Sequence, residues 1–174
     1  TQEQMKVYKK LQEMKPGDTS LLWGETGSGK TEVYMRMAED QLLSKKSCLI
    51  LAPEIGLIPQ LIDRFSKRFK TEVYEYHSYC SARHRTLVWK KIIDEDQPLI
   101  VIGTRSAVFL PIQNLGLIIM DEEHDASYKQ ESPMPCYDAR DVALERIKIN
   151  RAKLIFGSAT PSLRTWKRVV FEKN

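Results

Sequence analysis

The sequence contains little cysteine, and its cysteines lie far apart. Cys48, Cys80 and Cys136 are the only three in 174 residues, and no C-x-x-C pair is present. Their spacing therefore predicts neither a disulfide framework nor a zinc site. A reduced, cytoplasmic compartment fits such sparse cysteine usage best. Cys48 lies within an apolar run and is expected to be buried as a small hydrophobic side chain.

Long hydrophobic runs and a strong net charge are also missing. No stretch approaches the roughly 20 apolar residues of a membrane-spanning helix, so no membrane partner is expected. Lysine and arginine number 27 against 23 aspartate and glutamate residues, which gives a formal net charge of +4. This mild excess is compatible with nucleic acid but is weak support for it. Hydrophobic residues make up 42% of the chain, enough to fill the core of one domain.

Short apolar runs alternate with longer amphipathic stretches. This alternation predicts an α/β fold in which a parallel sheet carries helices on both faces. Strands are expected at residues 20–23, 48–52, 73–77, 99–103, 117–120 and 154–156. Helices are expected at residues 4–14, 31–44, 59–69, 82–94, 139–150 and 162–170. The least regular stretch is residues 125–137, and a loop of this length is often functional.

A glycine-rich motif follows the first expected strand. Residues 24–31 fit G-x-x-x-x-G-K-[ST], the P-loop, whose glycines let backbone N–H groups turn inward around phosphate oxygens. Lys30 is expected beside the β/γ-phosphates, and Thr31 is expected to offer its hydroxyl to Mg²⁺. The alternative is a merely structural turn, but an expected strand before the motif and a helix after it favour nucleotide binding. The predicted ATP-binding residues here are Gly24, Glu25, Thr26, Gly27, Ser28, Gly29, Lys30 and Thr31.

Acidic residues end a later apolar strand. Residues 117–120 are followed directly by Asp121, Glu122, Glu123 and His124, which is the Walker B arrangement. We expect Asp121 to hold Mg²⁺ and Glu122 to act as the general base on the attacking water. The alternative is that these two carboxylates merely end a strand and are exposed to solvent. Combined with the P-loop, they favour ATP hydrolysis, with Lys30, Asp121 and Glu122 as the catalytic residues.

The motifs D-E-E-H and, at residues 157–162, G-S-A-T-P-S resemble those of the DExH-type superfamily 2 helicases. Narrower strings closely resemble the PriA family of replication-restart helicases, over nearly the whole chain. These strings are P-E-I-G-L-I-P-Q at 53–60, I-G-T-R-S-A at 102–107 and S-Y-K-Q at 127–130. The resemblance implies a P-loop NTPase of RecA-like fold, a three-layer, doubly wound parallel sheet. The S-A-T strand is expected between the P-loop and Walker B strands.

The resemblance also implies roles for single residues. His124, Ser158, Ala159 and Thr160 would couple the state of the γ-phosphate to DNA and to a second lobe. Gln4 would read the adenine edge through its amide. Two further sets are implied to contact DNA. The backbone-gripping set is Pro53, Gly56, Gln60, Thr104, Arg105 and Ser106. The loop set is Tyr128 and Tyr137, to stack on bases, with Lys129 and Arg140 to neutralise phosphate.

The chain departs from the PriA pattern at two places. The usual Arg-Tyr-His-Ala-Arg-Asp is here Cys136-Tyr137-Asp138-Ala139-Arg140-Asp141, which should weaken phosphate attraction at Cys136 and Asp138. The usual His-Ser-Gly is here His77-Ser78-Tyr79, followed by Cys80, and we assign His77 no catalytic task.

The implied function is the first motor lobe of an ATP-dependent 3′–5′ DNA helicase in replication-fork restart. Residues 1–174 are expected to be one piece of a longer protein that also carries a second RecA-like lobe, a zinc-binding region and an N-terminal DNA-binding domain. Implied cofactors are ATP and Mg²⁺, with zinc only in that other region. Implied partners are single-stranded or forked DNA, single-strand-binding protein and primosome proteins.

Two alternatives stay open. One is another DNA motor, such as a restriction-enzyme translocase or a repair-coupling ATPase. The other is a non-catalytic module that uses the P-loop fold to scaffold replication proteins. Intact Lys30, Thr31, Asp121 and Glu122 count against the second.

Overall fold

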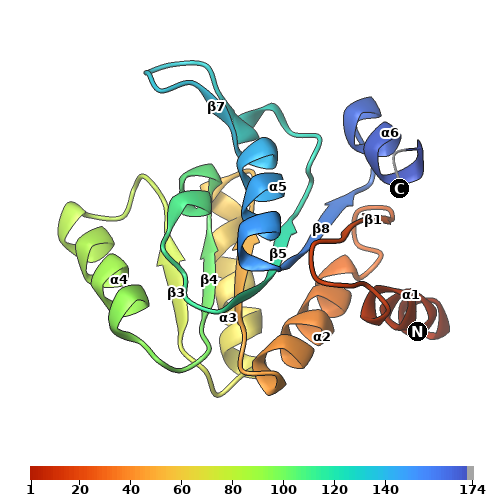
Figure 1. Cartoon of the computed structure of the whole chain (residues 1–174), viewed down its shortest axis with the longest axis horizontal. Helices are drawn as coiled ribbons and strands as arrows, with labels where there is room; N and C mark the ends of the chain where they lie inside the picture. Colours follow the sequence, from red (N-terminus) through yellow and green to blue (C-terminus); the bar gives the residue numbers. More distant parts are fainter. Residues whose placement is uncertain (172–174) are drawn as a thin grey trace.

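The computed structural model describes residues 1–171 and shows a six-stranded parallel sheet with helices on both faces (Figure 1). The predicted three-layer, RecA-like α/β fold is confirmed. The strand order is β1-β8-β5-β2-β4-β3, so the S-A-T strand β8 lies between the P-loop strand β1 and the acidic strand β5, as expected. The strands are β1 (Thr19–Trp23), β2 (Ser47–Leu51), β3 (Val73–Tyr76), β4 (Ile100–Gly103), β5 (Leu115–Met120) and β8 (Lys153–Ser158).

All six predicted helices are present: α4 and α5 have the predicted bounds, and the ends of the other four differ from the prediction by one or two residues. They are α1 (Gln2–Gln12), α2 (Lys30–Leu43), α3 (Ile58–Arg68), α4 (Ala82–Asp94), α5 (Ala139–Asn150) and α6 (Leu163–Phe171). Three short 3₁₀ turns are η1 (Ile55–Leu57), η2 (Arg105–Phe109) and η3 (Ala126–Tyr128). The predicted domain ran to residue 174, and its last three residues lie outside the described part.

The sheet is buried on both sides. Strands β2, β4 and β5 are fully buried, because α1, α2 and α3 pack on one face and α4 and α5 on the other. Alternate residues of one strand enter different cores, so Cys48 and Ile50 face one layer while Leu49 and Leu51 face the other. The predicted burial of Cys48 is thereby confirmed.

Register brings the motifs to one edge of the sheet. Leu51 pairs with both Met120 and Gly103, and Trp23 pairs with Ser158. Parallel strands therefore end at similar heights, and the segments that follow them meet at the carboxyl edge. In open α/β sheets this edge is where ligands bind.

The stretch at residues 125–137 is more ordered than its sequence suggested. It contains η3 and the strand β6 (Lys129–Gln130), which pairs antiparallel with β7 (Tyr137–Asp138). The Gln130 amide nitrogen donates to the backbone oxygens of Pro133 and Pro135, each at 2.9 Å. Among residues 1–171, no helix is both long and apolar enough to cross a membrane.

Candidate nucleotide site

The P-loop wraps the amino end of α2. Gly27 and Gly29 have φ values of +81° and +87°, which residues with a side chain rarely adopt, and Gly29 caps the helix. Lys30 follows as the first helical residue and is almost buried. Its ammonium group donates to the backbone oxygen of Gly24 at 2.9 Å. The sequence thus builds the strand–loop–helix context that phosphate binding requires.

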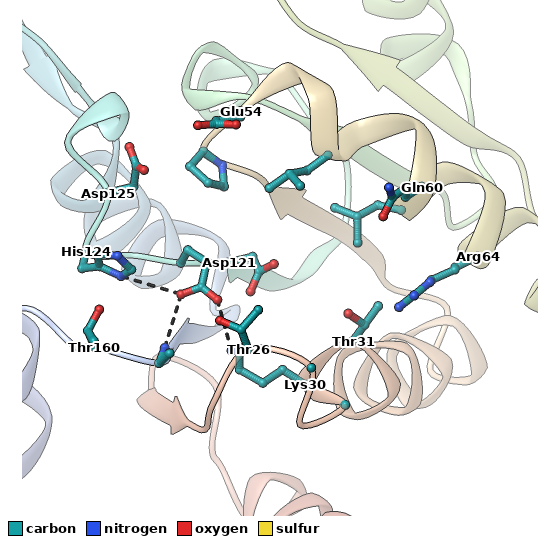
Figure 2. A pocket seen from close by; sticks show the side chains of 17 residues that line it. Thr26, Lys30, Thr31, Glu54, Gln60, Arg64, Asp121, His124, Asp125 and Thr160 are labelled. Carbon is teal, nitrogen blue, oxygen red and sulfur yellow. Dashed lines mark hydrogen bonds and ion pairs between the residues drawn. The ribbon is translucent and has the colours of Figure 1, made fainter.

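A cleft of about 720 Å³ opens above this loop (Figure 2). Its walls come from the P-loop, from α3 and from the segments after β5 and β8. The predicted nucleotide and coupling residues that line it are Thr26, Gly27, Gly29, Lys30, Thr31, Asp121, Glu122, His124, Ala159 and Thr160. Residues separated by more than a hundred positions therefore share one cavity, large enough for a nucleotide.

Glu122 connects all three motifs. One carboxylate oxygen lies 3.1 Å from the Lys30 ammonium nitrogen. The other oxygen accepts from the Ala159 backbone N–H at 3.3 Å and lies 3.7 Å from His124 Nδ1. The backbone of Glu122 is left-handed, with φ of +45°, which is uncommon for a residue with a side chain and typical of functional strain. The site thus holds its expected general base in contact with the P-loop and the S-A-T motif.

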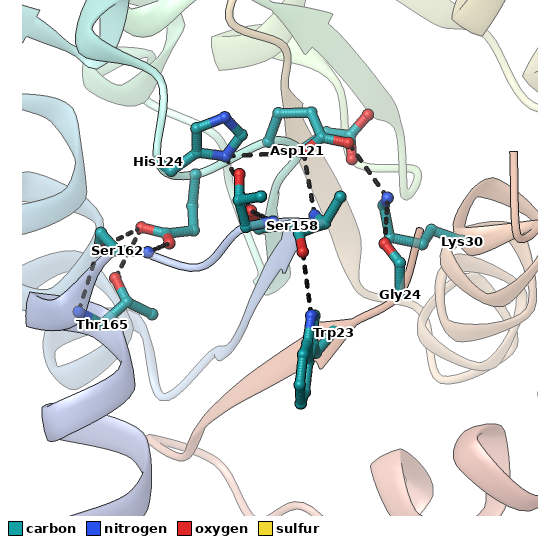
Figure 3. Close-up of polar contacts among 12 residues, drawn as sticks. Trp23, Gly24, Lys30, Asp121, His124, Ser158, Ser162 and Thr165 are labelled. Atoms are coloured by element: carbon teal, nitrogen blue, oxygen red, sulfur yellow. Dashed lines mark hydrogen bonds and ion pairs between the residues drawn. The ribbon is translucent and has the colours of Figure 1, made fainter. Parts of the chain in front are cut away.

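His124 and Ser158 form a direct link between the acidic motif and the S-A-T strand (Figure 3). The two side chains meet at 2.8 Å between Nδ1 and Oγ, and Ser158 is fully buried. Ser158 Oγ also accepts from the Thr160 backbone N–H at 3.0 Å. Trp23 adds a contact from β1, because its indole N–H donates to the Ala159 backbone oxygen at 3.0 Å.

Tyr34 supports Asp121, a role that the apolar helical period around Tyr34 does not predict. Its hydroxyl donates to Asp121 Oδ1 at 2.8 Å, and the ring is fully buried. Gly157 leaves room for that hydroxyl, since a Cβ there would lie 1.6 Å from it. Burial raises the pKa of Asp121, while the hydrogen bond from Tyr34 lowers it. Burial and Asp121 together raise the pKa of Tyr34 well above its usual range.

Glu123 is a second residue whose role was missed. It is fully buried and receives three hydrogen bonds from the start of α6: from the Ser162 backbone N–H at 2.7 Å, the Ser162 hydroxyl at 3.0 Å and the Thr165 hydroxyl at 2.7 Å. Figure 3 shows these contacts beside the His124–Ser158 pair. The acidic motif therefore anchors the helix that follows S-A-T.

Gln4 stands at the P-loop, on α1. Its side-chain amide donates to the Ser28 backbone oxygen at 3.1 Å. A Cβ on Gly29 would lie 2.0 Å from that amide nitrogen, so the two segments are in close contact. The position is compatible with adenine recognition, which stays a prediction.

The residues expected to grip the DNA backbone lie in three places. Pro53, Thr104, Arg105 and Ser106 line a second groove of about 450 Å³, next to the nucleotide cleft. Arg105 donates from Nη1 to the Ser127 backbone oxygen at 3.0 Å and so holds η3 in place. Gln60 instead lines the nucleotide cleft, one helical turn before Arg64. Gly56 lies exposed in η1.

The prediction that Tyr128 stacks on a base is wrong for this structure, because its side chain is fully buried. Its hydroxyl donates toward the backbone oxygens of Leu51 at 2.8 Å and Asp121 at 2.6 Å, between the ends of β2 and β5. Burial, with the charge of Asp121 next, raises its pKa well above the usual range. The S-Y-K-Q string therefore places a structural tyrosine beneath the site.

The remaining loop residues differ in accessibility. Tyr137 is half-buried, with its ring edge-on to Phe109 at a centroid distance of 4.9 Å. Lys129 is exposed and pairs with Glu131 at 2.6 Å. Arg140 is mostly buried and committed to protein: two of its nitrogens donate to Asp138 and a third donates to the Glu123 backbone oxygen, each at 2.8 Å. Phosphate would have to displace these bonds to reach Arg140.

The sequence pattern of the family described as DEAD/DEAH box helicase matches residues 1–169. The chain belongs to the DEAD/DEAH box helicase family.

This helicase-family chain is 52% identical over 155 residues to the replication restart protein PriA of Synechocystis sp., covering 88% of the chain and 18% of that relative. It is 43% identical over 171 residues to the Bacillus subtilis protein of the same name, covering 97% of the chain and 21% of the relative. The Helicobacter pylori J99 protein of that name is 48% identical over 159 residues, 91% of the chain and 25% of the relative. The chain thus spans about a fifth to a quarter of these relatives.

Solved structures agree on the fold. RecG bound to a three-way DNA junction aligns with a TM-score of 0.71 and 23% identity, over 99% of this chain and 22% of that one. The Pyrococcus furiosus Hef helicase domain aligns with a TM-score of 0.68 and 22% identity, over 97% of this chain and 35% of that one. At these identities the likeness is one of fold.

We expect Tyr128→Phe to destabilise this helicase-family domain by about 1–2 kcal/mol, because the backbone oxygens of Leu51 and Asp121 lose the hydroxyl that donates to them. Urea unfolding followed by circular dichroism measures the change. Tyr79→Phe is the matched control, since that side chain is 84% exposed and its loss should stay within about 0.5 kcal/mol. Equal stability of the two variants would contradict a structural role for the Tyr128 hydroxyl.

Proposed function

We propose that the chain is the ATP-binding motor lobe of an ATP-dependent 3′–5′ DNA helicase that acts in replication-fork restart and primosome assembly. The observation that carries the proposal is the position of the Glu122 carboxylate. It pairs with Lys30, accepts from the Ala159 amide and lies close to His124. Glu122, as the general base, would thus be held by both the P-loop and the S-A-T motif. Such an arrangement suits ATP hydrolysis that is coupled to motion of the helicase. The relatives named replication restart protein PriA support the cellular role.

The donor set of the cleft fits a nucleotide with Mg²⁺. Thr31 and Asp121 both line it, and hydroxyl and carboxylate oxygens are the ligands that Mg²⁺ prefers. When bound, Mg²⁺ would neutralise charge on the β- and γ-phosphates. Tyr34 keeps the Asp121 carboxylate oriented from below.

The order of events at Lys30 and Glu122 follows from their ion pair. An arriving γ-phosphate competes with Glu122 for the Lys30 ammonium group, because both are anions and Lys30 is almost buried. Once Lys30 turns to phosphate, Glu122 is free to accept a proton from the attacking water. His124 and Ser158 lie next to that carboxylate, so they are placed to sense its movement.

DNA is proposed to lie along the groove of Pro53, Thr104, Arg105 and Ser106, at the carboxyl ends of the strands. Single-stranded or forked DNA is the proposed nucleic acid, and single-strand-binding protein and primosome proteins are the proposed protein partners. A second lobe, assigned by the proposal to residues outside this chain, would supply the arginine finger. A zinc-binding region outside the chain likewise stays a prediction.

The 174-residue chain is expected to bind ATP with Mg²⁺ and to hydrolyse it very slowly. An arginine finger contributes about 10³–10⁵-fold in related phosphoryl transfer, and the proposal places it elsewhere. Lys30→Ala should weaken binding by roughly tenfold or more, since it removes a charge-assisted contact to phosphate. Titration with a fluorescent ATP analogue measures affinity, and phosphate release measures turnover.

Lys148→Ala is the control, because Lys148 is an exposed lysine on α5 whose ammonium group pairs with Glu145, far from the P-loop in the sequence. It should bind nucleotide like the parent chain. Absence of nucleotide binding in the parent chain would favour the scaffold alternative. Strong DNA-stimulated turnover by the chain alone would contradict the assignment of the arginine finger to another lobe.

A further inference from the structure

Three metal-ligating side chains of different kinds gather where β3 ends. Ligand atoms of Glu75, His77 and Cys80 all lie within 4.8 Å of one another. His77 is buried, while Glu75 and Cys80 are half-buried. Nothing in the proposed ATP chemistry uses these residues. The cysteine spacing alone predicted no zinc site, because only one member of the cluster is a cysteine.

The local backbone explains why the three side chains converge. Glu75 and His77 are two residues apart at the end of a strand, and side chains at such positions share a face. The chain then turns back, with the Cys80 backbone N–H donating to the His77 oxygen at 3.1 Å. This turn returns the Cys80 thiol to the histidine, in an H-x-x-C spacing.

The ring of His77 already has a partner that an ion can replace. Its Nε2 lies 2.7 Å from Glu75 Oε1, within hydrogen-bond distance. Ligands of a tetrahedral ion with bonds near 2.0–2.1 Å stand about 3.3 Å apart, so a small rotation of the carboxylate makes room. The contact of the Tyr79 amide with Nδ1, at 3.2 Å, must then give way, because Nδ1 carries the proton once Nε2 is bound.

We propose that Glu75, His77 and Cys80 form a site for one Zn²⁺-class ion, with the fourth position open to water. Thiolate, imidazole and carboxylate are together the donor set of zinc and similar borderline-soft metals. Mg²⁺ disfavours sulfur and nitrogen donors and so belongs to the nucleotide cleft. The proposed ion is therefore distinct from the one that accompanies ATP, and from any zinc bound outside this chain.

The location gives the ion a structural consequence. Ser78 and Tyr79, which lie between two of the ligands, line the same groove as Thr104 and Arg105. An ion that ties Cys80 to β3 would fix this wall of the groove. Binding would thus change how the loop presents itself to whatever occupies the groove.

Titration of the 174-residue chain with Co²⁺ alone, in place of Zn²⁺, tests the proposal. A thiolate-to-cobalt charge-transfer band should appear in the near ultraviolet and saturate at one equivalent. Cys80→Ser should abolish the band, whereas Cys136→Ser, which removes an exposed cysteine elsewhere, should keep it. Zn²⁺ should displace the cobalt, and excess Mg²⁺ should not.

The other two ligands are tested by affinity. Loss of residues that merely orient metal ligands typically costs 10–100-fold, so Glu75→Gln and His77→Asn should each weaken Co²⁺ binding by roughly 100-fold or more. Circular dichroism confirms folding, and Glu75→Gln keeps the test decisive if the buried His77 variant does not fold. Absence of a saturable band in the parent chain, a band that survives Cys80→Ser, or unchanged affinity of Glu75→Gln would overturn the proposal.

Discussion

In the longer helicase proposed above, Glu122→Gln is expected to lower DNA-stimulated ATP turnover by about 10²–10⁴-fold, the usual contribution of a general base. Nucleotide binding should survive, and affinity should rise a few-fold. The reason is the ion pair between Glu122 and Lys30, at 3.1 Å, which competes with phosphate when no nucleotide is bound. The neutral amide removes that competition and keeps the shape of the side chain.

Two measurements separate these effects. Steady-state phosphate release with single-stranded DNA gives turnover, and titration of the 174-residue chain with an ATP analogue gives affinity. Glu131→Gln serves as the control, because it makes the same chemical change at an exposed site in the loop. Near-normal turnover of Glu122→Gln would remove Glu122 from catalysis. A large loss of affinity would show that its contact with Lys30 helps to build the site.

The P-loop, the acidic motif and the S-A-T motif were predicted because each is a continuous string that begins at the end of a strand. Parallel pairing then determines where the strings meet, and the β1-β8-β5 order puts them side by side. The apolar runs likewise predicted the strands, because strands that are buried on both faces consist almost entirely of Val, Ile, Leu and similar residues. Fold and motif positions therefore follow from local patterns.

Tyr128 shows where prediction from local sequence patterns fails. Aromatic and basic residues in an irregular stretch suggested a stacking surface, but the ring is buried and its hydroxyl ties the ends of β2 and β5 together. Exposure depends on how a loop folds back on the sheet, and no local pattern encodes that. Arg140 is similar, because its bond to the Glu123 backbone oxygen, 17 positions away, forms only in the folded chain.

Tyr34 and Glu123 were missed for the same reason. Tyr34 fits an apolar helical period, and nothing local shows that its hydroxyl reaches Asp121, 87 positions away. In the sequence, Glu123 is one of three consecutive acidic residues after a strand, a pattern that is typical of a solvent-exposed strand end. Its three partners lie about 40 positions later in the chain. Such pairs become visible only when tertiary contacts are known.

Glu123→Ala is expected to lower the free energy of unfolding by about 3 kcal/mol. The change leaves the Ser162 backbone N–H and the Thr165 hydroxyl without their charged acceptor in a buried place, and hydrogen bonds to charged groups contribute about 1.5–3 kcal/mol each. The start of α6 should loosen, because its first turn is attached to the acidic motif through this carboxylate. Urea unfolding measures the loss, and amide hydrogen exchange over residues 162–166 measures the loosening.

A double-mutant cycle with Thr165→Ala isolates the contact itself. If the 2.7 Å bond between Thr165 Oγ1 and Glu123 is stabilising, the two losses should fall short of additivity by roughly 1–2 kcal/mol. Glu145→Ala, on the exposed side of α5, should cost within about 0.5 kcal/mol and not couple to Thr165. Strict additivity of Glu123→Ala and Thr165→Ala, or unchanged exchange at the start of α6, would mean that the acidic motif does not hold this helix. A positive result would give the chain a direct mechanical link from the residue beside the proposed general base Glu122 to the helix that follows the S-A-T motif.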